Sequence, residues 1–316
     1  MVNFITALTG IVLVLIALLC FNFAIIFQKM GLKEGPEITF DKGLKGILKS
    51  FKEIIKNKWW LLGAVLGVVA WFPYIMSIGL VGVMVSLPIN SLGIIIMVIA
   101  ANRLLGEKIK WYEFLAIIIL ALSPILIVLA GISNIVINLH LFVIPLIIFL
   151  AITFSITVFS FVLSIKKRGI NLEGFFIMLT GSFLLALGNV FTNILAQAVI
   201  QANIQLTWYI WAEIFFGIFW FEYNHLWVFL GWWGLAICNI SSFAFYQSAF
   251  QKSRVAVVFP VFNSIGLLVP IIAGIFVFQQ TFTNYFLFFL AILIIFIGTS
   301  ALGRFQYLEQ ELEQKL

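Results

Sequence analysis

The sequence predicts an all-α membrane protein, a polytopic bundle of about nine transmembrane helices with an inverted internal repeat. Three observations lead to this fold class. Hydrophobic residues make up 64% of the 316 positions and charged residues 9%, against roughly 45–50% and 25% in soluble domains. The apolar residues form runs of about 20 or more, the length of one helical membrane crossing. Basic residues occur only between alternate runs, as expected when positive loops stay cytoplasmic.

The apolar runs are predicted to be helices, because lipid allows only helices and closed barrels, and barrel strands would alternate apolar and polar residues. The first run, 4–27, has no basic residue before it and no cleavage pattern after it, so we expect a retained span and not a signal peptide. The other runs lie at 59–80, 82–104, 112–131, 140–165, 174–199, 226–250, 254–278 and 284–303.

Charge then predicts the orientation. All 18 Lys and Arg residues fall in 29–58, 103–110, 166–168, 252–254 and the tail after Gly303. Crossing the membrane at each apolar run brings these segments to one side, which the positive-inside rule assigns to the cytoplasm. We therefore expect a multi-pass protein of the cell membrane with its N-terminus outside and its C-terminus inside. The net charge of +6 follows from this topology, and no nucleic-acid partner is expected.

Two segments lie outside the predicted spans. Residues 38–57 form a basic amphipathic helix, with Leu44, Ile47, Leu48, Phe51 and Ile55 on one face and Lys45, Lys49, Lys52 and Lys56 on another. Such a helix lies on anionic lipid, either as a tether or as a lipid sensor or partner-binding helix. Residues 200–225 are rich in aromatics and contain no basic residue. This outer segment is predicted to be an interfacial belt, a re-entrant helix or a lid.

A repeat divides the chain. Asn90-Ser91-Leu92-Gly93 recurs 173 positions later as Asn263-Ser264-Ile265-Gly266, each copy follows a proline, and the apolar helices that follow end in turns at Glu107 and Gln280. An odd number of spans separates the copies, so the repeat is inverted, an arrangement that permits alternating access around a site near the midplane. The predicted parts are a first half, 1–131, with four spans and helix 38–57; a second half, 132–303, with five spans and segment 200–225; and a cytoplasmic tail, 304–316.

These motifs resemble a known family. Val83-Met84-Val85-Ser86-Leu87-Pro88, Leu104-Leu105-Gly106-Glu107-Lys108 and Ser253-Arg254-Val255-Ala256-Val257-Val258-Phe259-Pro260 resemble the EamA-type repeat of the drug/metabolite transporter (DMT) superfamily. The nine spans, Gln28-Lys29-Met30-Gly31-Leu32 and Trp59-Trp60 look closest in layout to its NIPA-type magnesium transporters. The resemblance implies a transporter. The chain departs from the NIPA pattern at Val68-Val69-Ala70 and Gln279-Gln280, where acidic residues are usual, which weakens a magnesium assignment.

Catalytic and metal chemistry is not expected. The twelve acidic residues lie in loops, span ends, the outer segment or the tail, whereas Mg²⁺ sites and proton relays usually use carboxylates. The histidines, His140 and His225, lie at span ends; Glu222 with His225 could bind a metal, but a solvated helix end is the simpler interpretation. Cys20 and Cys238 lie in apolar runs, as ordinary packing residues do. We predict no enzyme, no cofactor and no resident metal.

The candidate substrate site consists of neutral polar and aromatic residues inside the spans. Helical spacing brings the polar ones onto shared faces, either for hydrogen bonds between helices or for a polar cavity. The candidates are Ser86, Asn90, Asn189, Asn193, Asn239, Ser242, Tyr246 and Asn263, with Trp71 and Tyr74 as an aromatic wall. Pro88 and Pro260 each remove a helical hydrogen bond, and we predict that they act as hinges.

We therefore predict a transporter that moves a small organic solute or metabolite by alternating access. A magnesium or other divalent cation transporter is the alternative. A non-transporting scaffold or lipid-handling protein is the alternative from another class. The expected partners are membrane lipids and a small-molecule solute, and a homodimer is left open. Direction, coupling ion and solute are not specified by these patterns.

Overall fold

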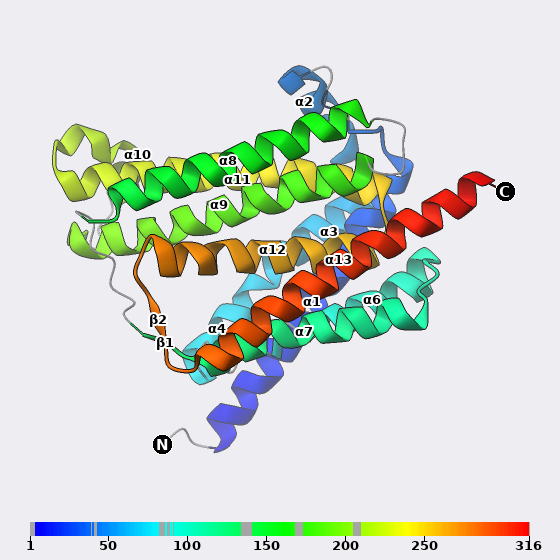
Figure 1. Cartoon of the computed structure of the whole chain (residues 1–316), viewed down its shortest axis with the longest axis horizontal. Coiled ribbons are helices and arrows are strands. Elements are labelled where there is room, and N and C mark those ends of the chain that lie inside the picture. The colour runs from blue at the N-terminus through cyan, green and yellow to red at the C-terminus, as the bar shows by residue number, and fades with distance from the viewer. Residues whose placement is uncertain are drawn as a thin grey trace. The chain divides into compact units, whose positions relative to one another are not determined.

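The computed structural model describes residues 4–315, except 39, 41–42, 82–85, 87–88, 91, 134–140, 168–172 and 205–209. The described chain is helical apart from one short strand pair, which confirms the all-α class (Figure 1). Eight of its helical segments are long and apolar enough to cross a membrane, and one of these, Lys58–Ser77, contains two consecutive helices. A shorter apolar helix covers Gly93–Leu105. The protein is therefore an integral, multi-pass membrane protein.

Contacts divide the chain into two compact units. The first unit comprises Met1–Gly131, Gln247–Ser264 and Asn284–Leu316, and the second comprises Ile132–Tyr246 and Ile265–Thr283. The boundary after Gly131 coincides with the predicted boundary between the repeat halves. The first unit also takes in two segments from beyond that boundary, so the repeat halves and the compact units are different divisions of the chain.

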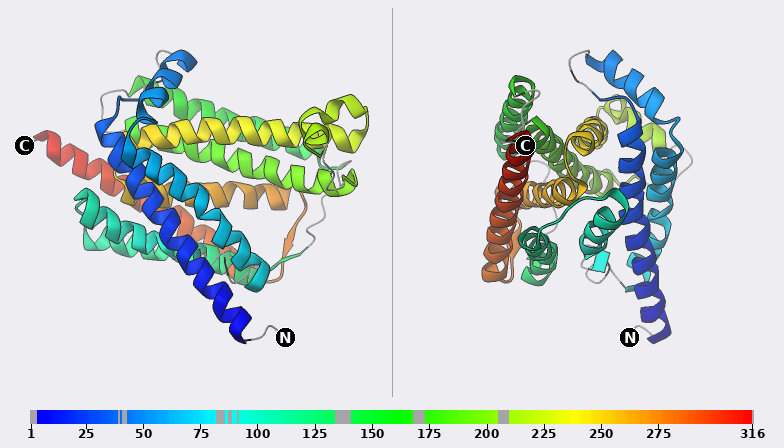
Figure 2. Two further views of the ribbon diagram at one scale, coloured as in Figure 1. Left: turned by 180° about the vertical axis from the view of Figure 1, so that it is seen from behind. Right: turned by 90° about the vertical axis from the view of Figure 1, so that its right-hand side faces the viewer.

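In the first unit, α1 (Phe4–Glu34) packs against α3 (Lys58–Val69), α4 (Trp71–Val81) and α6 (Gly93–Leu105), as Figure 2 shows. Helix α7 (Trp111–Ala130) lies beside α13 (Tyr285–Lys315) (Figure 1). The amphipathic helix α2 (Gly43–Ile54) follows α1. Helix α13 continues through the predicted tail, whose Glu, Gln and Leu residues favour helix.

Local sequence signals fix where several of these helices begin and end. Asn57 caps α3, because its Oδ1 accepts hydrogen bonds from the backbone N–H groups of Trp59 and Trp60 at 2.9 and 3.3 Å. The predicted span 59–80 is two helices, α3 and α4, which meet at Ala70. Pro73 explains the break, since it has no N–H to bond the carbonyl four residues earlier.

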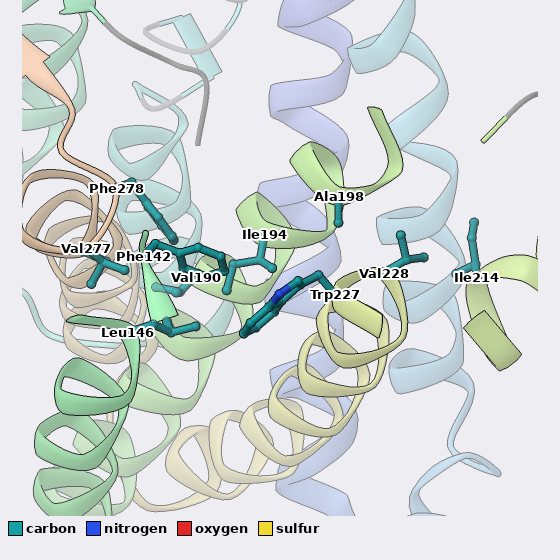
Figure 3. Close-up of a cluster of buried hydrophobic side chains, with 11 residues drawn as sticks. Phe142, Leu146, Val190, Ile194, Ala198, Ile214, Trp227, Val228, Val277 and Phe278 are labelled. Carbon is teal, nitrogen blue, oxygen red and sulfur yellow. The ribbon is translucent and has the colours of Figure 1, made fainter. Parts of the chain in front are cut away.

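The second unit contains α8 (Val143–Lys166), α9 (Glu173–Gln201), α10 (Ile210–Phe216), the 3-10 turn η1 (Gly217–Trp220), most of α11 (Tyr223–Lys252) and the end of α12 (Val255–Phe276). Strand β1 (Ile132–Ser133) pairs antiparallel with β2 (Thr281–Phe282). The core of the second unit gathers side chains from α8, α9, α11 and α12 around Phe142 and Trp227, whose ring centroids are 4.7 Å apart (Figure 3).

The outer segment 200–225 contains α10 and η1, with Trp208 and Tyr209 outside the described residues. Phe221 has a φ of 54° and is 92% exposed. This exposed ring suits an interfacial position, since aromatic side chains collect at the headgroup level. The choice among belt, re-entrant helix and lid stays a prediction.

Close packing of α1 on α3 depends on Gly63. A Cβ added to Gly63 would lie 2.5 Å from the carbonyl oxygen of Ala24, whereas one added to Gly67 would lie 3.6 Å from the Ala24 Cβ. We expect Gly63→Ala to lower stability by about 1–3 kcal/mol, because the clash is with backbone. Gly67→Ala is the matched control on the same helix, with the same gain in helix propensity and an ordinary contact. Equal melting temperatures for the two variants would contradict this packing.

Candidate functional site

A buried asparagine marks the contact between α1 and α6. Asn22 lies on α1, is 4% exposed, and donates a 2.7 Å hydrogen bond from Nδ2 to the carbonyl oxygen of Leu18. A Cβ added to Gly93, the first residue of α6, would overlap with Nδ2 of Asn22. The amide of Asn22 therefore lies directly against the backbone at the start of α6, where only glycine leaves room for it.

Asn22 and Asn90 both carry an acceptor atom that has no partner within the part of the chain that the structure describes. These atoms are their side-chain oxygens, Oδ1, and both are buried. The amide of Asn22 cannot simply be reversed to relieve this, because its oxygen would then face the carbonyl oxygen of Leu18. An unsatisfied buried acceptor costs about 1–3 kcal/mol.

Asn90 lies three residues before Gly93 in the sequence. It belongs to a turn in which the N–H of Leu92 donates to the carbonyl of Ile89 at 3.2 Å. We call Asn22, Asn90 and Gly93 the asparagine site. It combines two elements far apart in sequence and presents two carbonyl-type acceptors.

Further polar and aromatic residues of the first unit surround α1. Ser77 and Ser86 are fully buried, and their hydroxyl oxygens lie 2.8 Å apart in a hydrogen bond. Phe21, Trp71 and Tyr74 form an edge-to-face trio, with ring centroids 5.6 to 5.9 Å apart. Tyr74 is buried, but Trp71 is 55% exposed. Trp71 therefore forms the outer side of the trio.

The predicted site residues divide between the two units. The first unit contains Trp71, Tyr74, Ser86, Asn90 and Asn263, and the second contains Asn189, Asn193, Asn239, Ser242 and Tyr246. Two of the predicted site residues in the second unit form hydrogen bonds between helices. Asn189 donates to the carbonyl of Gly266 at 3.0 Å, and Ser242 donates to the carbonyl of Gly181 at 2.8 Å. These bonds join α9 to α12 and to α11.

Three other predicted site residues of the second unit and of α12 lie at half-buried positions. Asn239 packs against Gly188 and returns a 3.0 Å bond to the carbonyl of Leu235 on its own helix. Asn193 and Asn263 are half-buried. Asn239 thus fills the space that a glycine opens on α9, a packing role.

Of the two predicted hinge prolines, the structure describes one. Pro88 lies outside the described residues. Pro260 is buried within α12, which runs as one helix from Val255 to Phe276. A hinge at Pro260 stays a prediction, and any bending there would start from a continuous helix.

A second polar network surrounds the junction between α11 and α12, within the first unit. Lys29 of α1 is 5% exposed, and its Nζ donates to the carbonyl of Ser253 at 2.8 Å. Gln247 donates to Oε1 of Gln28 at 2.7 Å and accepts from the indole N–H of Trp60 at 3.2 Å. These bonds tie α1 and α3 to the end of α11.

Carboxylates complete this network. Glu107 is 8% exposed and accepts hydrogen bonds from the backbone N–H groups of Val255 and Ala256, at 2.9 and 3.1 Å. It thereby caps the N-terminus of α12, where a negative charge is favourable. Arg254 binds both carboxylate oxygens of Glu113, at 2.6 and 3.2 Å. We call this network of Gln28, Lys29, Glu107, Glu113, Gln247 and Arg254 the α11–α12 junction.

The repeated turns share their local structure. Gly106 and Gln279, which are 173 positions apart, both have left-handed φ values, 70° and 54°. The next residues, Glu107 and Gln280, donate backbone bonds to the carbonyls of Ala101 and Gly274, six residues earlier in each case. The turns predicted from the repeat are therefore alike in conformation, although the relation of the two halves as wholes stays a prediction.

The pair Glu222 and His225 lies at the start of α11, where Glu222 is exposed and His225 is buried. His225 is 7% exposed, its ring stacks on Trp220 with centroids 5.9 Å apart, and its Nδ1 lies 3.0 Å from a carboxylate oxygen of Glu222. Stacking against Trp220 removes the imidazole from solvent. Among the described residues, no group of three or more His, Cys, Asp or Glu side chains could hold a metal ion.

Comparison with known protein families, with characterised proteins and with solved structures finds no match to this chain. The site therefore has to be interpreted from its own residues. Sequence reasoning missed Asn22, because it has no polar neighbour three or four positions away on α1. A lone asparagine in the middle of a long apolar run was the available signal, since such residues face protein or a cavity.

Proposed function

We propose that this protein is a transporter that moves a small organic solute across the membrane by alternating access, and that the solute binds at the asparagine site. The observation that carries the proposal is the pair of buried amide oxygens of Asn22 and Asn90, which have no partner among the described residues. Buried polar groups in native proteins nearly always have partners. A solute with hydrogen-bond donors would supply them, near the middle of a span.

The α11–α12 junction supports the second part of the proposal, alternating access. It holds the segment after Gln247 against α1, α3 and the turn between α6 and α7 through polar side chains. Polar contacts can exchange with water when a path opens, whereas an apolar core cannot do so cheaply. In the proposed cycle, this junction closes one end of the path and opens when the solute leaves by that end.

The same junction supports the proposed orientation. Lys33 donates to the carbonyl of Leu105 at 3.1 Å, Arg254 donates to the carbonyl of Lys108 at 2.7 Å, and Lys252 pairs with Glu37. Basic residues from the end of α1, the end of α11 and the turn after α11 thus meet at one end of the first unit. By the positive-inside rule this end faces the cytoplasm, with the N-terminus outside.

A divalent cation such as Mg²⁺ is the second candidate, because amide oxygens are acceptable ligands for hard cations. It is less favoured, since Glu107 and Glu113 are already engaged by the α12 N-terminus and by Arg254. A scaffold or lipid-handling protein is the third candidate. It would leave the burial of two unsatisfied acceptors without a purpose.

Counterflow in proteoliposomes tests the proposal. Vesicles containing the purified chain are loaded with an unlabelled amino acid, nucleoside, sugar, quaternary amine or Mg²⁺ and then diluted into the labelled form. A carrier that alternates gives transient accumulation of at least one organic solute above the level in protein-free vesicles. Accumulation of Mg²⁺ alone would favour the second candidate. No accumulation of any solute, together with lipid scrambling, would overturn the proposal.

We also propose that α2 lies on an anionic membrane surface. Leu48 and Ile55 are 67% and 48% exposed, and all four lysines of the helix and its following turn are exposed. Each lysine near an anionic surface contributes about 1 kcal/mol. A fluorophore on Leu48→Cys, with Cys20 and Cys238 replaced by alanine, should be quenched by brominated lipid chains in anionic nanodiscs. A label on Lys49→Cys is the control, and equal quenching at both positions would refute the orientation.

A further inference from the structure

The buried side-chain atoms without a partner at the asparagine site are acceptors, and this restricts what can bind there. In Asn22, Nδ2 donates one of its two N–H groups to the Leu18 carbonyl, and the unpartnered buried atom is Oδ1. In Asn90 the unpartnered buried atom is likewise Oδ1. A bound molecule gains from these two oxygens only if it carries N–H or O–H donors. A solute that has acceptors alone would leave both amide oxygens unsatisfied.

Charge restricts the solute further. A buried cation needs a partner charge, because transfer of an isolated ion from water into a protein interior costs several kcal/mol. Glu107 and Glu113, the buried carboxylates of the first unit, are already bound to the α12 N-terminus and to Arg254. Lys29, which is also buried in this unit, adds positive charge. An anion would face two amide oxygens and gain nothing from them.

We propose that the solute is an uncharged molecule with at least two hydrogen-bond donors, of the carboxamide or urea type, and that it donates to Oδ1 of Asn22 and of Asn90. This inference rests on the proposed function, since it names the substrate class of the same site. Amide N–H groups fit best, because an uncharged amide brings two donors in a small planar group without an ionic charge to desolvate.

Competition with three probes of similar size tests both restrictions. Uptake of labelled urea, acetamide and uracil is measured in proteoliposomes that contain the full chain. The unlabelled competitor is acetamide, or urea where acetamide itself is the labelled solute that enters best. This competitor should inhibit uptake of the labelled solute. Tetramethylurea lacks donors, and guanidinium has the shape and donors of urea with a positive charge. Tetramethylurea should compete about 100-fold more weakly, because it leaves the polar groups of the site unpaired. Guanidinium should also compete about 100-fold more weakly, because its charge has no free partner charge at the site.

The outcomes separate this inference from the proposed function. Equal competition by tetramethylurea would overturn the donor requirement, and equal competition by guanidinium would overturn the charge requirement. Uptake of some other solute class, with none of urea, acetamide or uracil, would overturn the inference and leave the transporter proposal standing. Absence of flux for every solute in the counterflow panel would overturn both. Glycerol included as a labelled polyol shows whether O–H donors suffice in place of N–H donors.

Discussion

Replacing Asn22 with leucine is expected to abolish solute uptake while the chain stays at least as stable as the wild type. Leucine has nearly the shape of asparagine, so it can occupy the same space against Gly93. The substitution removes a buried acceptor that has no partner in the described structure. Removing such an unsatisfied group is neutral or stabilising, whereas removing half of a satisfied pair is costly. Uptake should therefore fall, while the melting temperature stays the same or rises.

This combination separates a substrate-binding residue from a structural one. If Asn22 served only packing, Asn22→Leu would change stability and uptake together. Asn90→Leu should give the same loss of uptake, because its oxygen is also buried and unpartnered in the described structure. Ser155→Ala is the control, since Ser155 bonds only its own helix at 2.7 Å from an exposed position on α8. Normal uptake by both asparagine variants would eliminate the asparagine site.

Glu107→Ala is expected to lower the stability of the protein by about 1–3 kcal/mol, the cost of leaving buried donors without an acceptor. The carboxylate accepts two backbone N–H groups of α12 and is the opposite charge that acts on the buried Lys29. Without it, both donors lose their acceptor, and the buried ammonium of Lys29 loses a nearby opposite charge. Thermal unfolding in detergent would measure the loss.

Glu107→Gln provides the matched comparison. Glutamine keeps the side-chain shape and one acceptor oxygen, so the α12 N-terminus retains a partial cap, but the negative charge is lost. We expect a loss smaller than that of Glu107→Ala and larger than that of a substitution on the exposed face of α8, such as Ser155→Ala. A Glu107→Ala variant that unfolds at the wild-type temperature would show that Glu107 does not hold the junction together.

The fold class was predictable because hydropathy and charge act along the whole chain. Long apolar runs must bury their backbone hydrogen bonds inside helices, and α7, α8, α9, α11 and α12 begin and end within three residues of the expected limits. Helices α1 and α13 run on past the expected limits, and α6 covers only the later part of the expected span 82–104. The Gln279–Gln280 turn was also predictable, because it lies 173 positions after the Gly106–Glu107 turn, at the spacing of the repeated Asn-Ser motif. The break at Ala70 was missed, since a proline in a membrane helix is often tolerated without one.

The candidate site was only partly predictable, because helical spacing shows which residues share a face and not what that face meets. Asn189 lies on α9, at helical spacing from Asn193, and Asn239 and Ser242 lie on α11, at helical spacing from each other. The partners of Asn189, Asn239 and Ser242 are backbone carbonyls and a glycine. Glu107 was known only as part of a motif, because its partners on α12 lie more than a hundred positions away. Such contacts depend on tertiary packing, which a local pattern does not contain.

The solute-induced change in melting temperature of the wild type and of Asn22→Leu tests the central claim most directly. A ligand present at 100 times its dissociation constant stabilises the folded state by about 2.7 kcal/mol. Urea, acetamide, uracil and the solutes of the counterflow panel are added at millimolar concentration to both proteins. The account predicts that at least one organic solute raises the melting temperature of the wild type and leaves that of Asn22→Leu unchanged. An equal rise in both proteins would contradict binding at the asparagine site.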